Sequence, residues 1–428
     1  MTGATMVRLR DLGEWSGGNT PSKANTAYWT DGIVPWVSPK DMKVDEITSS
    51  EDRVSEAALR EGRASLVPVG SVLVVTRSGI LSHTLPVAVT KTPVTINQDL
   101  KALTPKPGVL PKYVAHALRG ASHRILKACS KHGTTVASIE TNALLDFEIP
   151  LAALDEQRRI VAEVEKQFSR LDEAVANLKR VKANLRRQRA AVLRAAVAGT
   201  LLGDQRRAEW IDTTIGDVGQ VISGLTKNPK REGLPRKLPY LRVANVYANE
   251  LRLDQIEYIG VADQELDKLL LRQGDVLVVE GNGSPDQIGR VALWNGSIEN
   301  CVHQNHLIKV RFGSRVTPHW ALTWLLSPGG RHEIEQVSSS TSGLHTLSTG
   351  KVARLPIPIP PVREQHRIVA EVDRRLSIVR EVEAEVDANL KRAQALRQSV
   401  LERAFSSGVR SREGEEPRAR RAAASPDA

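Results

Sequence analysis

The chain contains the stretch Glu156-Gln157-Arg158-Arg159-Ile160-Val161-Ala162-Glu163-Val164 and repeats it as Glu364-Gln365-His366-Arg367-Ile368-Val369-Ala370-Glu371-Val372. The two copies stay in step without a gap as far as Ala196 in the first and Ala404 in the second. An Ile-Pro pair precedes each copy, and a glycine follows each one shortly afterwards. Because a unit repeated so far apart indicates an internal duplication, the sequence predicts two similar halves.

Each copy is predicted to form one long helix, because no proline interrupts it and its apolar residues follow one stripe. These residues fall on alternating three- and four-residue steps, which is the a/d pattern of a coiled-coil seam. The predicted seam consists of Val164, Phe168, Leu171, Val175, Leu178 and Leu185 in the first copy and Val372, Leu376, Val379, Val386, Leu390 and Val400 in the second. A helix with one apolar stripe needs a partner, and the obvious partner is the other copy.

The overall composition favours a partner that carries negative charge. The formal net charge is +11 in 428 residues, although charge alone fits a merely basic soluble protein equally well. The two cysteines, Cys129 and Cys301, lie far apart without a CxxC motif, so we expect buried or inert thiols in a cytoplasmic protein. The sequence has no signal peptide and no apolar run of membrane-spanning length, so no membrane association is expected. Residues 409–428 contain few large apolar residues and are expected to be disordered.

The regions before each long helix have an α+β character. In the first region, short apolar runs bounded by glycine and proline predict strands at Ile33–Val37, Ser71–Val75 and Leu85–Val89. Tyr113–Ala128 has the apolar spacing of a helix. We therefore expect domains of mixed or antiparallel sheet with helices.

The second region repeats landmarks of the first. Pro35-Trp36-Val37-Ser38 corresponds to Pro239-Tyr240-Leu241-Arg242, and Gly70–Val75 corresponds to Gly274–Val279. The spacing between these landmarks is the same in both halves, while the segments between them differ strongly. A shared scaffold that carries two different recognition surfaces would produce this pattern.

Several motifs resemble one known family. The segments Gly17-Gly18-Asn19-Thr20-Pro21-Ser22, Ile33–Met42 and Pro358–Gln365 together resemble the DNA-specificity subunit of type I restriction–modification enzymes. The start of the second region, Gly224-Leu225-Thr226-Lys227-Asn228, departs from the family's opening motif, and Pro150–Gln157 is a looser version of the motif at Pro358–Gln365.

The resemblance implies a pseudo-twofold molecule in which each globular region is a target-recognition domain that reads half of a split site in double-stranded DNA. It also implies that the two helices lie antiparallel as a spacer, that their ends hold two methyltransferase subunits, and that helicase–nuclease restriction subunits join the complex. The expected boundaries are 1–150 for the first target-recognition domain, 151–203 for the first spacer helix, 204–357 for the second domain, 358–408 for the second helix and 409–428 for the tail.

The sequence contains no recognisable catalytic motif. It has no Asn/Asp-Pro-Pro-Tyr/Phe loop of a DNA amino-methyltransferase, no GxxxxGK[ST] phosphate loop and no HExxH or HxxxH pair. We therefore expect a non-catalytic subunit that holds no cofactor or metal of its own, with S-adenosylmethionine, ATP and Mg²⁺ bound by its partners. The alternatives are a coiled-coil scaffold with two protein-binding arms and, less consistent with the missing motifs, a self-contained methyltransferase or nuclease.

The candidate DNA-contacting residues are polar or basic and lie in predicted loops. Arginine pairs with guanine, asparagine and glutamine pair with adenine, and serine, threonine and lysine hold phosphates. The candidates are Asn19, Thr20, Ser22, Lys23, Lys40, Arg77, Ser78 and His83 in the first region and Lys227, Asn228, Lys230, Arg242, Asn245, Asn282, Ser284, Gln287 and Arg290 in the second. The alternative for any single residue is an ordinary turn or surface position.

The second helix contains an acidic run over residues 381–387 that the first helix lacks. If the helices lie antiparallel, this run comes near Lys179, Arg180 and Lys182 of the first helix. The alternative is a solvated charged face, because exposed ion pairs contribute little to stability.

Overall fold

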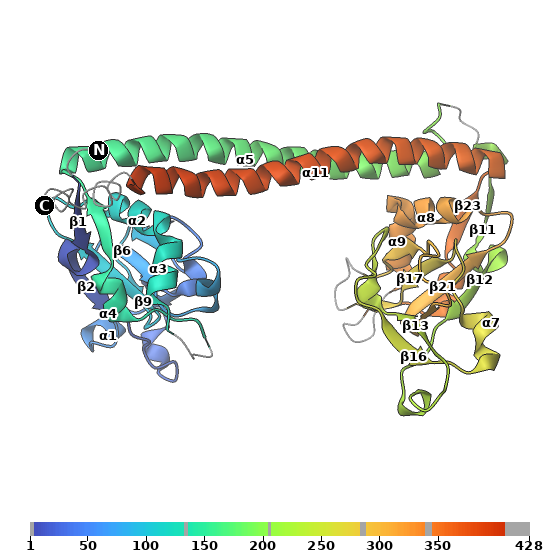
Figure 1. The fold of residues 1–428 in the computed structure, drawn as a ribbon, viewed down its shortest axis with the longest axis horizontal. Coiled ribbons are helices and arrows are strands. Elements are labelled where there is room, and N and C mark those ends of the chain that lie inside the picture. The colour runs from blue at the N-terminus through green and yellow to red at the C-terminus, as the bar shows by residue number, and fades with distance from the viewer. Residues whose placement is uncertain (1–3, 132–135, 204–206, 283–287, 339–344, 407–428) are drawn as a thin grey trace, which may run out of the picture. The chain divides into compact units, whose positions relative to one another are not determined.

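The computed structural model describes residues 4–131, 136–203, 207–282, 288–338 and 345–406 (Figure 1). The predicted disordered tail therefore lies outside the described residues. The chain divides into two compact units, one of residues 1–178 with 388–428 and one of residues 179–387. Each unit thus contains one globular domain and about half of each long helix.

Both long helices form as predicted. Helix α5 runs over Leu154–Val197 with 44 residues, and α11 runs over Val362–Ser406 with 45 residues. Acidic residues occupy the first turn of each helix, where they complement the positive end of the helix dipole. Helix α5 stops at Gly199, whose positive φ of 73° ends the helix in the left-handed conformation.

The residues of the predicted seam are buried or half-buried. Of its twelve residues none is exposed: Val164, Phe168, Leu185, Val372, Leu376, Val379 and Val386 are buried, and Leu171, Val175, Leu178, Leu390 and Val400 are half-buried. Part of this stripe also faces a globular domain, since Val164 and Phe168 belong to the core of the first domain. Within the first unit the apolar stripe of α5 therefore also docks the helix on its domain.

The helix halves run antiparallel within each unit. In the first unit, Arg397 near the end of α11 pairs with Asp172 in the first half of α5 at 2.6 Å. In the second unit, Lys182 of α5 pairs with Asp387 of α11 at 2.5 Å. This second pair is one of those expected from the acidic run of the second helix.

The first domain is built on two main sheets. The larger sheet has the strand order β2-β9-β6-β7-β4 and the smaller one β5-β3-β8, with β3 and β8 parallel. A third sheet pairs β1 with β10 just before α5. The strands are β1 Thr5–Arg8, β2 Gly13–Gly17, β3 Val34–Val37, β4 Glu46–Ile47, β5 Asp52–Val54, β6 Val72–Val75, β7 Val87–Thr90, β8 Thr95–Ile96, β9 Leu100–Pro105 and β10 Glu148–Leu151. The predicted strands at residues 33–37, 71–75 and 85–89 are thereby confirmed as β3, β6 and β7.

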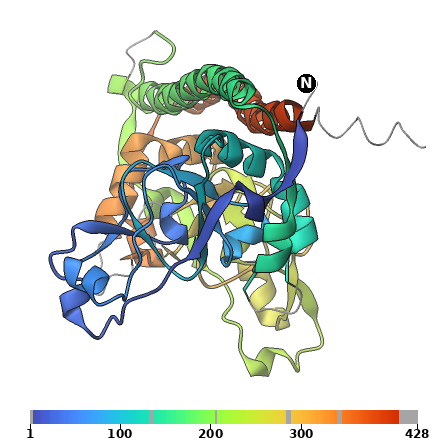
Figure 2. The same cartoon turned by 90° about the vertical axis from the view of Figure 1, so that its left-hand side faces the viewer.

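The helices of the first domain are α1 Glu56–Arg60, α2 Pro111–Gly120, α3 Ser122–Cys129 and α4 Thr141–Asp146. The single helix predicted over 113–128 was wrong, because the chain turns at Ala121 into a separate helix. At Gly120 the backbone approaches α11 so closely that an added Cβ would lie 3.2 Å from the Leu401 Cβ. This long-range contact is invisible to local periodicity. Helix α2 lies directly beneath the long helices of its unit (Figure 2).

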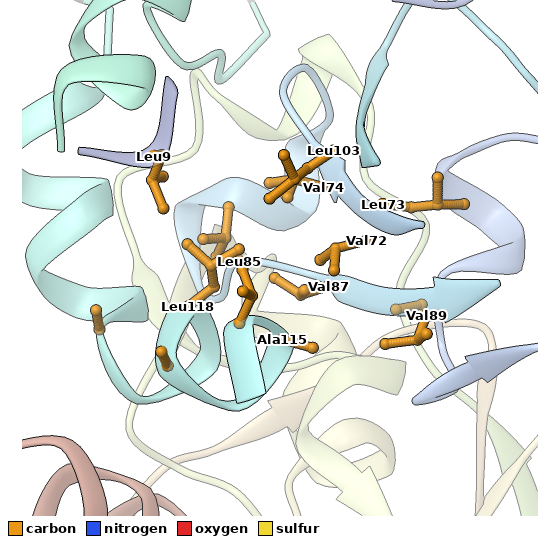
Figure 3. Packing of buried hydrophobic residues seen from close by; sticks show 14 of the residues in the cluster. Leu9, Val72, Leu73, Val74, Leu85, Val87, Val89, Leu103, Ala115 and Leu118 are labelled. Carbon is orange, nitrogen blue, oxygen red and sulfur yellow. The ribbon is translucent and has the colours of Figure 1, made fainter. Parts of the chain in front are cut away.

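The core of the first domain lies between the larger sheet and helix α2. Figure 3 shows Val72 and Val87 from the sheet converging on Leu118 of α2, and all three are buried. The same cluster continues through Tyr113 into Val164 of α5. Helix α2 is thus the layer that joins the sheet to the spacer.

The second domain repeats this plan. Its main sheets have the orders β12-β21-β17-β19 and β16-β13-β20, again with a parallel pair, β13 and β20, inside the smaller one. Strands β11 and β23 pair before α11 as β1 and β10 do before α5. The strands are β11 Ile211–Thr214, β12 Gly219–Ser223, β13 Lys237–Leu241, β14 Val246–Tyr247, β15 Glu250–Leu251, β16 Glu257–Gly260, β17 Val276–Val279, β18 Gly281–Asn282, β19 Val291–Leu293, β20 Val302–His303, β21 Leu307–Phe312, β22 His345–Thr346 and β23 Pro356–Ile359. The helices are α6 Ile215–Val218, α7 Leu266–Leu269, α8 Pro318–Leu326, α9 Pro328–Val337 and α10 Thr349–Ala353.

One glutamine anchors each long helix to its domain. Gln157 accepts a hydrogen bond from the Leu110 backbone and donates to the carbonyls of Gly108 and Ala152 at 2.8–3.0 Å. Gln365 repeats this, accepting from Thr317 and donating to the carbonyls of Arg315 and Pro360. Both side chains are buried, so the repeated Glu-Gln motif has a structural cause: its glutamine satisfies three backbone groups at the start of the helix.

The remaining expectations about composition can be compared with the described residues. Cys129 and Cys301 are both free and buried, as predicted, and burial raises the pKa of the Cys301 thiol to about 12. None of the helices in the described part of the chain combines the length and hydrophobicity of a membrane span. Among the same residues no cluster of three metal-ligating side chains occurs.

Candidate nucleic-acid interface

Hydrogen bonds of its backbone hold the loop after β2 in place. Gly18 fits because a Cβ at this position would overlap the carbonyl oxygens of Ile96 and Asn97. The Asn19 amide donates to the Ile96 carbonyl, and the Trp36 indole donates to the Asn19 carbonyl, both at 3.0 Å. The side chains of Asn19 and its neighbour therefore project from a fixed backbone into solvent.

This loop borders a polar hollow of about 670 Å³ in the first domain. The hollow brings together three predicted residues, Asn19, Thr20 and Ser22, and adds Arg63 and Gln98. The Thr20 hydroxyl donates a hydrogen bond to the Gln98 side-chain carbonyl. Amide, hydroxyl and guanidinium groups thus meet on one concave surface, and Gln98 is a residue that the sequence-based candidate set lacks.

A second hollow of about 640 Å³ lies between the first domain and α11, within the first unit. It is lined by two further predicted residues, Lys40 and Ser78, together with the basic residues Lys43, Arg119 and Arg397. Lys40 forms ion pairs with Asp52 at 2.9 Å and Glu51 at 3.1 Å. Hydrogen bonds to these two carboxylates raise the pKa of the exposed Lys40 ammonium, so it stays a cation.

The loop after β6 carries the remaining candidates of the first domain. Arg77 is half exposed at its side chain and pairs with Asp99 at 2.6 Å. The Ser78 hydroxyl accepts from the Ile80 amide and so caps the short 3₁₀ turn Gly79–Ser82. His83, which follows this turn, is exposed, as are Ser22 and Lys23 in the earlier loop.

In the second domain the predicted basic residues gather around one carboxylate. Lys227 pairs with Glu257 at 3.2 Å, and Arg242 pairs with the same group at 2.6 Å. Asn228 and Lys230 are exposed on either side of Pro229, at the start of the short 3₁₀ turn Pro229–Arg231. Four of the predicted residues therefore lie in the loop between β12 and β13 or next to it: Lys227, Asn228, Lys230 and Arg242.

Asn245 has to be removed from the candidate set. It is buried, its side-chain oxygen accepts from the Arg242 backbone amide, and its nitrogen donates to the carbonyls of Arg252 and Gln255. In the first domain Asp41 makes the same contact to the Ser38 amide. Asn245 is thus the equivalent of that capping residue and has no donor left for a base.

Arg290 belongs to a stack that the sequence did not reveal. Its guanidinium carbon lies 4.9 Å from the Tyr247 ring centre, and that of Arg252 lies 3.9 Å from it. Cation–π contacts of this kind hold guanidinium groups in place without neutralising their charge. Arg252 also forms an ion pair with Glu250 at 3.0 Å, so its charge is partly neutralised while the Tyr247 ring holds both guanidinium groups in place.

The side chains of three candidates in the second domain lie outside the described part of the structure. Asn282 belongs to β18, whose backbone pairs with β22, while its side chain lies outside the described part of the structure. Ser284 and Gln287 fall outside the described residues altogether. They remain predictions.

Comparison with known proteins gives a consistent match. A family model described as the type I restriction modification DNA specificity domain matches residues 1–185 and 207–388. The type I restriction enzyme EcoR124I/EcoR124II specificity subunit of Escherichia coli is 42% identical over 158 residues, which are 37% of this chain and 39% of that protein. The StySPI specificity subunit of Salmonella potsdam is 28% identical over 312 residues, covering 71% of this chain and 66% of that protein. The matched parts thus span less than two thirds of the length of both relatives.

Solved structures share the fold. A chain from a study of complex assembly and conformational transition of the type I R-M system superimposes with a TM-score of 0.72 at 21% identity, covering 95% of this chain and 98% of that one. The HsdS subunit from Thermoanaerobacter tengcongensis gives a TM-score of 0.51, also at 21% identity, with coverage of 95% and 97%.

Proposed function

This chain belongs to the type I restriction–modification DNA specificity family, and from that premise we propose that it is the subunit that reads the DNA site for such an enzyme. Each globular domain reads one half of a two-part site in double-stranded DNA. The chain performs no chemistry itself. Methylation and cleavage belong to two methyltransferase subunits and to restriction subunits in the cytoplasm, and these partners hold S-adenosylmethionine, ATP and Mg²⁺.

Recognition of a two-part DNA site is supported by one observation: the two domains share a scaffold, but their loops differ. Gly18 and Gly224 both fit against carbonyls at the end of the parallel edge strand of the smaller sheet, β8 in the first domain and β20 in the second. Beyond this shared point, the first domain continues with Asn19 beside a polar hollow, and the second with Leu225 and the basic residues around Glu257. Two domains with the same backbone scaffold but different side chains in their loops would bind DNA in equivalent orientations and recognise two different base sequences.

The chemistry of the exposed loops matches DNA. Lysines such as Lys23 and Lys230 suit phosphates, while Asn19, Arg77 and Arg290 can reach base edges in the major groove. Arg290, which stacks on Tyr247 beside the Arg252–Glu250 ion pair, adds a guanidinium group in a fixed position in the second domain. We assign phosphate contacts to the lysines and base contacts to the amides and guanidinium groups.

We assign the spacer role to the antiparallel helices. Gln157 and Gln365 join each helix start to its domain through three hydrogen bonds apiece, so a change in helix length would move a domain as a body. The gap between the half-sites then depends on helix length, and the partner subunits bind near the helix ends.

The test uses the full chain assembled with its methyltransferase subunits. Sequencing of the methylated DNA should give one split motif, and duplex binding should weaken steeply as salt rises, because phosphate contacts release counterions. Inserting one heptad into both helices at matched positions should change the gap and leave both half-sites intact. A protein-binding scaffold would instead show no salt-dependent duplex binding and no methylated motif.

A further inference from the structure

In each domain two adjacent residues with amide side chains follow the parallel edge strand of the smaller sheet, β8 or β20. In the first domain Asn97 and Gln98 follow β8, and in the second Gln304 and Asn305 follow β20. The equivalence rests on structure, because Asn19 and Leu225 donate their backbone amides to matching carbonyls of Ile96 and His303.

The first amide of each pair supports the fold. Asn97 is buried, accepts from the Asp99 backbone amide at 3.0 Å and donates to the Asp99 carboxylate at 3.1 Å. The Gln304 side-chain carbonyl accepts from the Val243 backbone amide at 3.2 Å. These two side chains therefore hold neighbouring segments together.

The second amide of the first domain points to a different role. Gln98 is exposed and lines the polar hollow with Asn19 and Arg63. Thr20 donates to its carbonyl oxygen, which fixes the orientation of the amide. Within the described residues the Gln98 side-chain nitrogen donates no hydrogen bond, so both of its N–H groups and one carbonyl lone pair remain for a ligand.

Asn305 occupies the same place in the second domain. Its backbone amide donates to the Leu225 carbonyl at 2.9 Å, and its own carbonyl accepts from the Ser223 hydroxyl at 3.1 Å. The backbone is thus held on both sides, while the amide nitrogen of the half-buried side chain hydrogen-bonds the His306 imidazole at 3.5 Å, which leaves its second N–H for a ligand. Both domains present one planar amide from a rigid backbone at an equivalent point.

We propose that Gln98 and Asn305 are specificity-determining residues, each of which reads one adenine in its own half-site. A side-chain amide can accept from adenine N6 and donate to N7 at the same time, a pairing that other bases do not offer. Thr20 acts as a positioning residue, because its hydroxyl orients the Gln98 amide. This inference rests on the proposed function and goes beyond it by assigning a base to a residue.

The test is to sequence the DNA methylated by complexes that carry Gln98→Ala, Gln98→Glu or Asn305→Ala. Gln98→Ala should relax one adenine position in one half-site, lowering discrimination there about tenfold, and Asn305→Ala should do so only in the other half-site. Gln98→Glu keeps the size of the side chain but only accepts, so it should shift the preference at that position toward cytosine, whose N4 donates. Gln188→Ala, which removes an exposed amide from α5, is the matched control and should leave the motif unchanged.

The possible failures can be told apart. A wild-type complex that methylates no split motif would overturn the proposed function, and this inference with it. A wild-type complex with a split motif that Gln98→Ala and Gln98→Glu both leave unchanged would overturn the inference alone. Uniform weakening at every position would identify Gln98 as a backbone contact and would also overturn it. Because Gln98 is exposed, the two substitutions should assemble normally, and subunit assembly is checked by size-exclusion chromatography.

Discussion

Both domains have an edge-on aromatic pair where they meet their long helices, and the first domain also has ion pairs there. In the first domain Tyr113 of α2 packs against Phe405 of α11 with ring centres 5.1 Å apart. In the first domain Lys112 of α2 pairs with Glu165 of α5 at 2.5 Å, and Arg397 of α11 pairs with Asp45 at 2.9 Å. In the second domain Trp320 of α8 takes the place that Tyr113 has on α2 and packs edge-on against Trp210 with ring centres 5.3 Å apart. Tyr113 and Trp320 donate equivalent hydrogen bonds to the Pro150 and Pro358 carbonyls, while their aromatic partners differ. The repeat therefore conserves the backbone hydrogen bonds more strictly than the side chains packed around them.

The largest effect on stability is expected from the loss of Trp320, which packs against Trp210 in the second unit. Trp320 is fully buried and donates to the Pro358 carbonyl at 2.8 Å. Trp320→Ala should destabilise its unit by about 3–5 kcal/mol, because it creates a large cavity and leaves that carbonyl unpaired. Hydrogen exchange of the full chain should show lost protection in the second domain only. Equal loss in both domains would mean that the two units do not unfold separately.

The glutamine anchors should behave alike in both units. Gln157→Ala and Gln365→Ala each leave three backbone groups without their partner and should each cost about 2–3 kcal/mol. Thermal unfolding measures this, with Gln188→Ala, at an exposed position on α5, as a control that changes stability by less than about 0.5 kcal/mol. A large cost at one anchor and none at the other would break the equivalence of the two halves.

Acidification should lower the unfolding free energy of both units, because each contains a buried histidine with a lowered pKa. Burial lowers the pKa of His116 in the first domain and of His303 in the second to about 4. The unfolded chain therefore binds protons first as pH falls, so the stability contribution is complete above about pH 6.5 and is lost toward pH 4. At pH 5 each histidine should cost about 2 kcal/mol of unfolding free energy relative to pH 7.

Substitution separates these two histidines. His116→Leu should reduce the acid sensitivity of the first domain alone, as read from hydrogen exchange at pH 7 and pH 5. His123→Leu, at an exposed position on α3, should leave that sensitivity intact. An unchanged pH profile in the His116→Leu protein would refute this account of acid sensitivity.

The smallest effect on stability is expected from the loss of the ion pairs that Arg397 of α11 forms in the first unit. Arg397→Ala removes two partly exposed ion pairs and the stacking of Arg397 over Phe168, at 4.0 Å from the ring centre. The cost should be about 1 kcal/mol at low salt and should shrink as salt rises, because such pairs are screened. A salt series of unfolding measurements on the wild type and the variant tests this. A loss that stayed constant with salt would assign the contribution to stacking alone.

Much of this architecture follows from local sequence signals. The duplication, the helix pair with its buried seam and the strands at β3, β6 and β7 are visible because apolar periodicity and repeated motifs are local properties. The break after Gly120 is not visible, since it depends on the approach of Leu401, which is distant in the chain.

The site was harder to predict because loop residues share one composition whether they contact DNA or cap a turn. Asn245 had the right side chain for a base contact, and its alignment with Asp41 was the available signal of its capping role. The stack on Tyr247 and the exposure of Gln98 depend on which strands pair, which sequence spacing alone did not specify.

The most direct test of two independent readers is domain exchange within the assembled methyltransferase. Residues 1–150 are replaced by the corresponding domain of a relative with a different site, residues 204–357 are replaced in a second chimera, and the methylated DNA is sequenced. We predict that each chimera changes one half of the split motif and keeps the other half and the gap. A chimera that altered both halves at once would contradict the account.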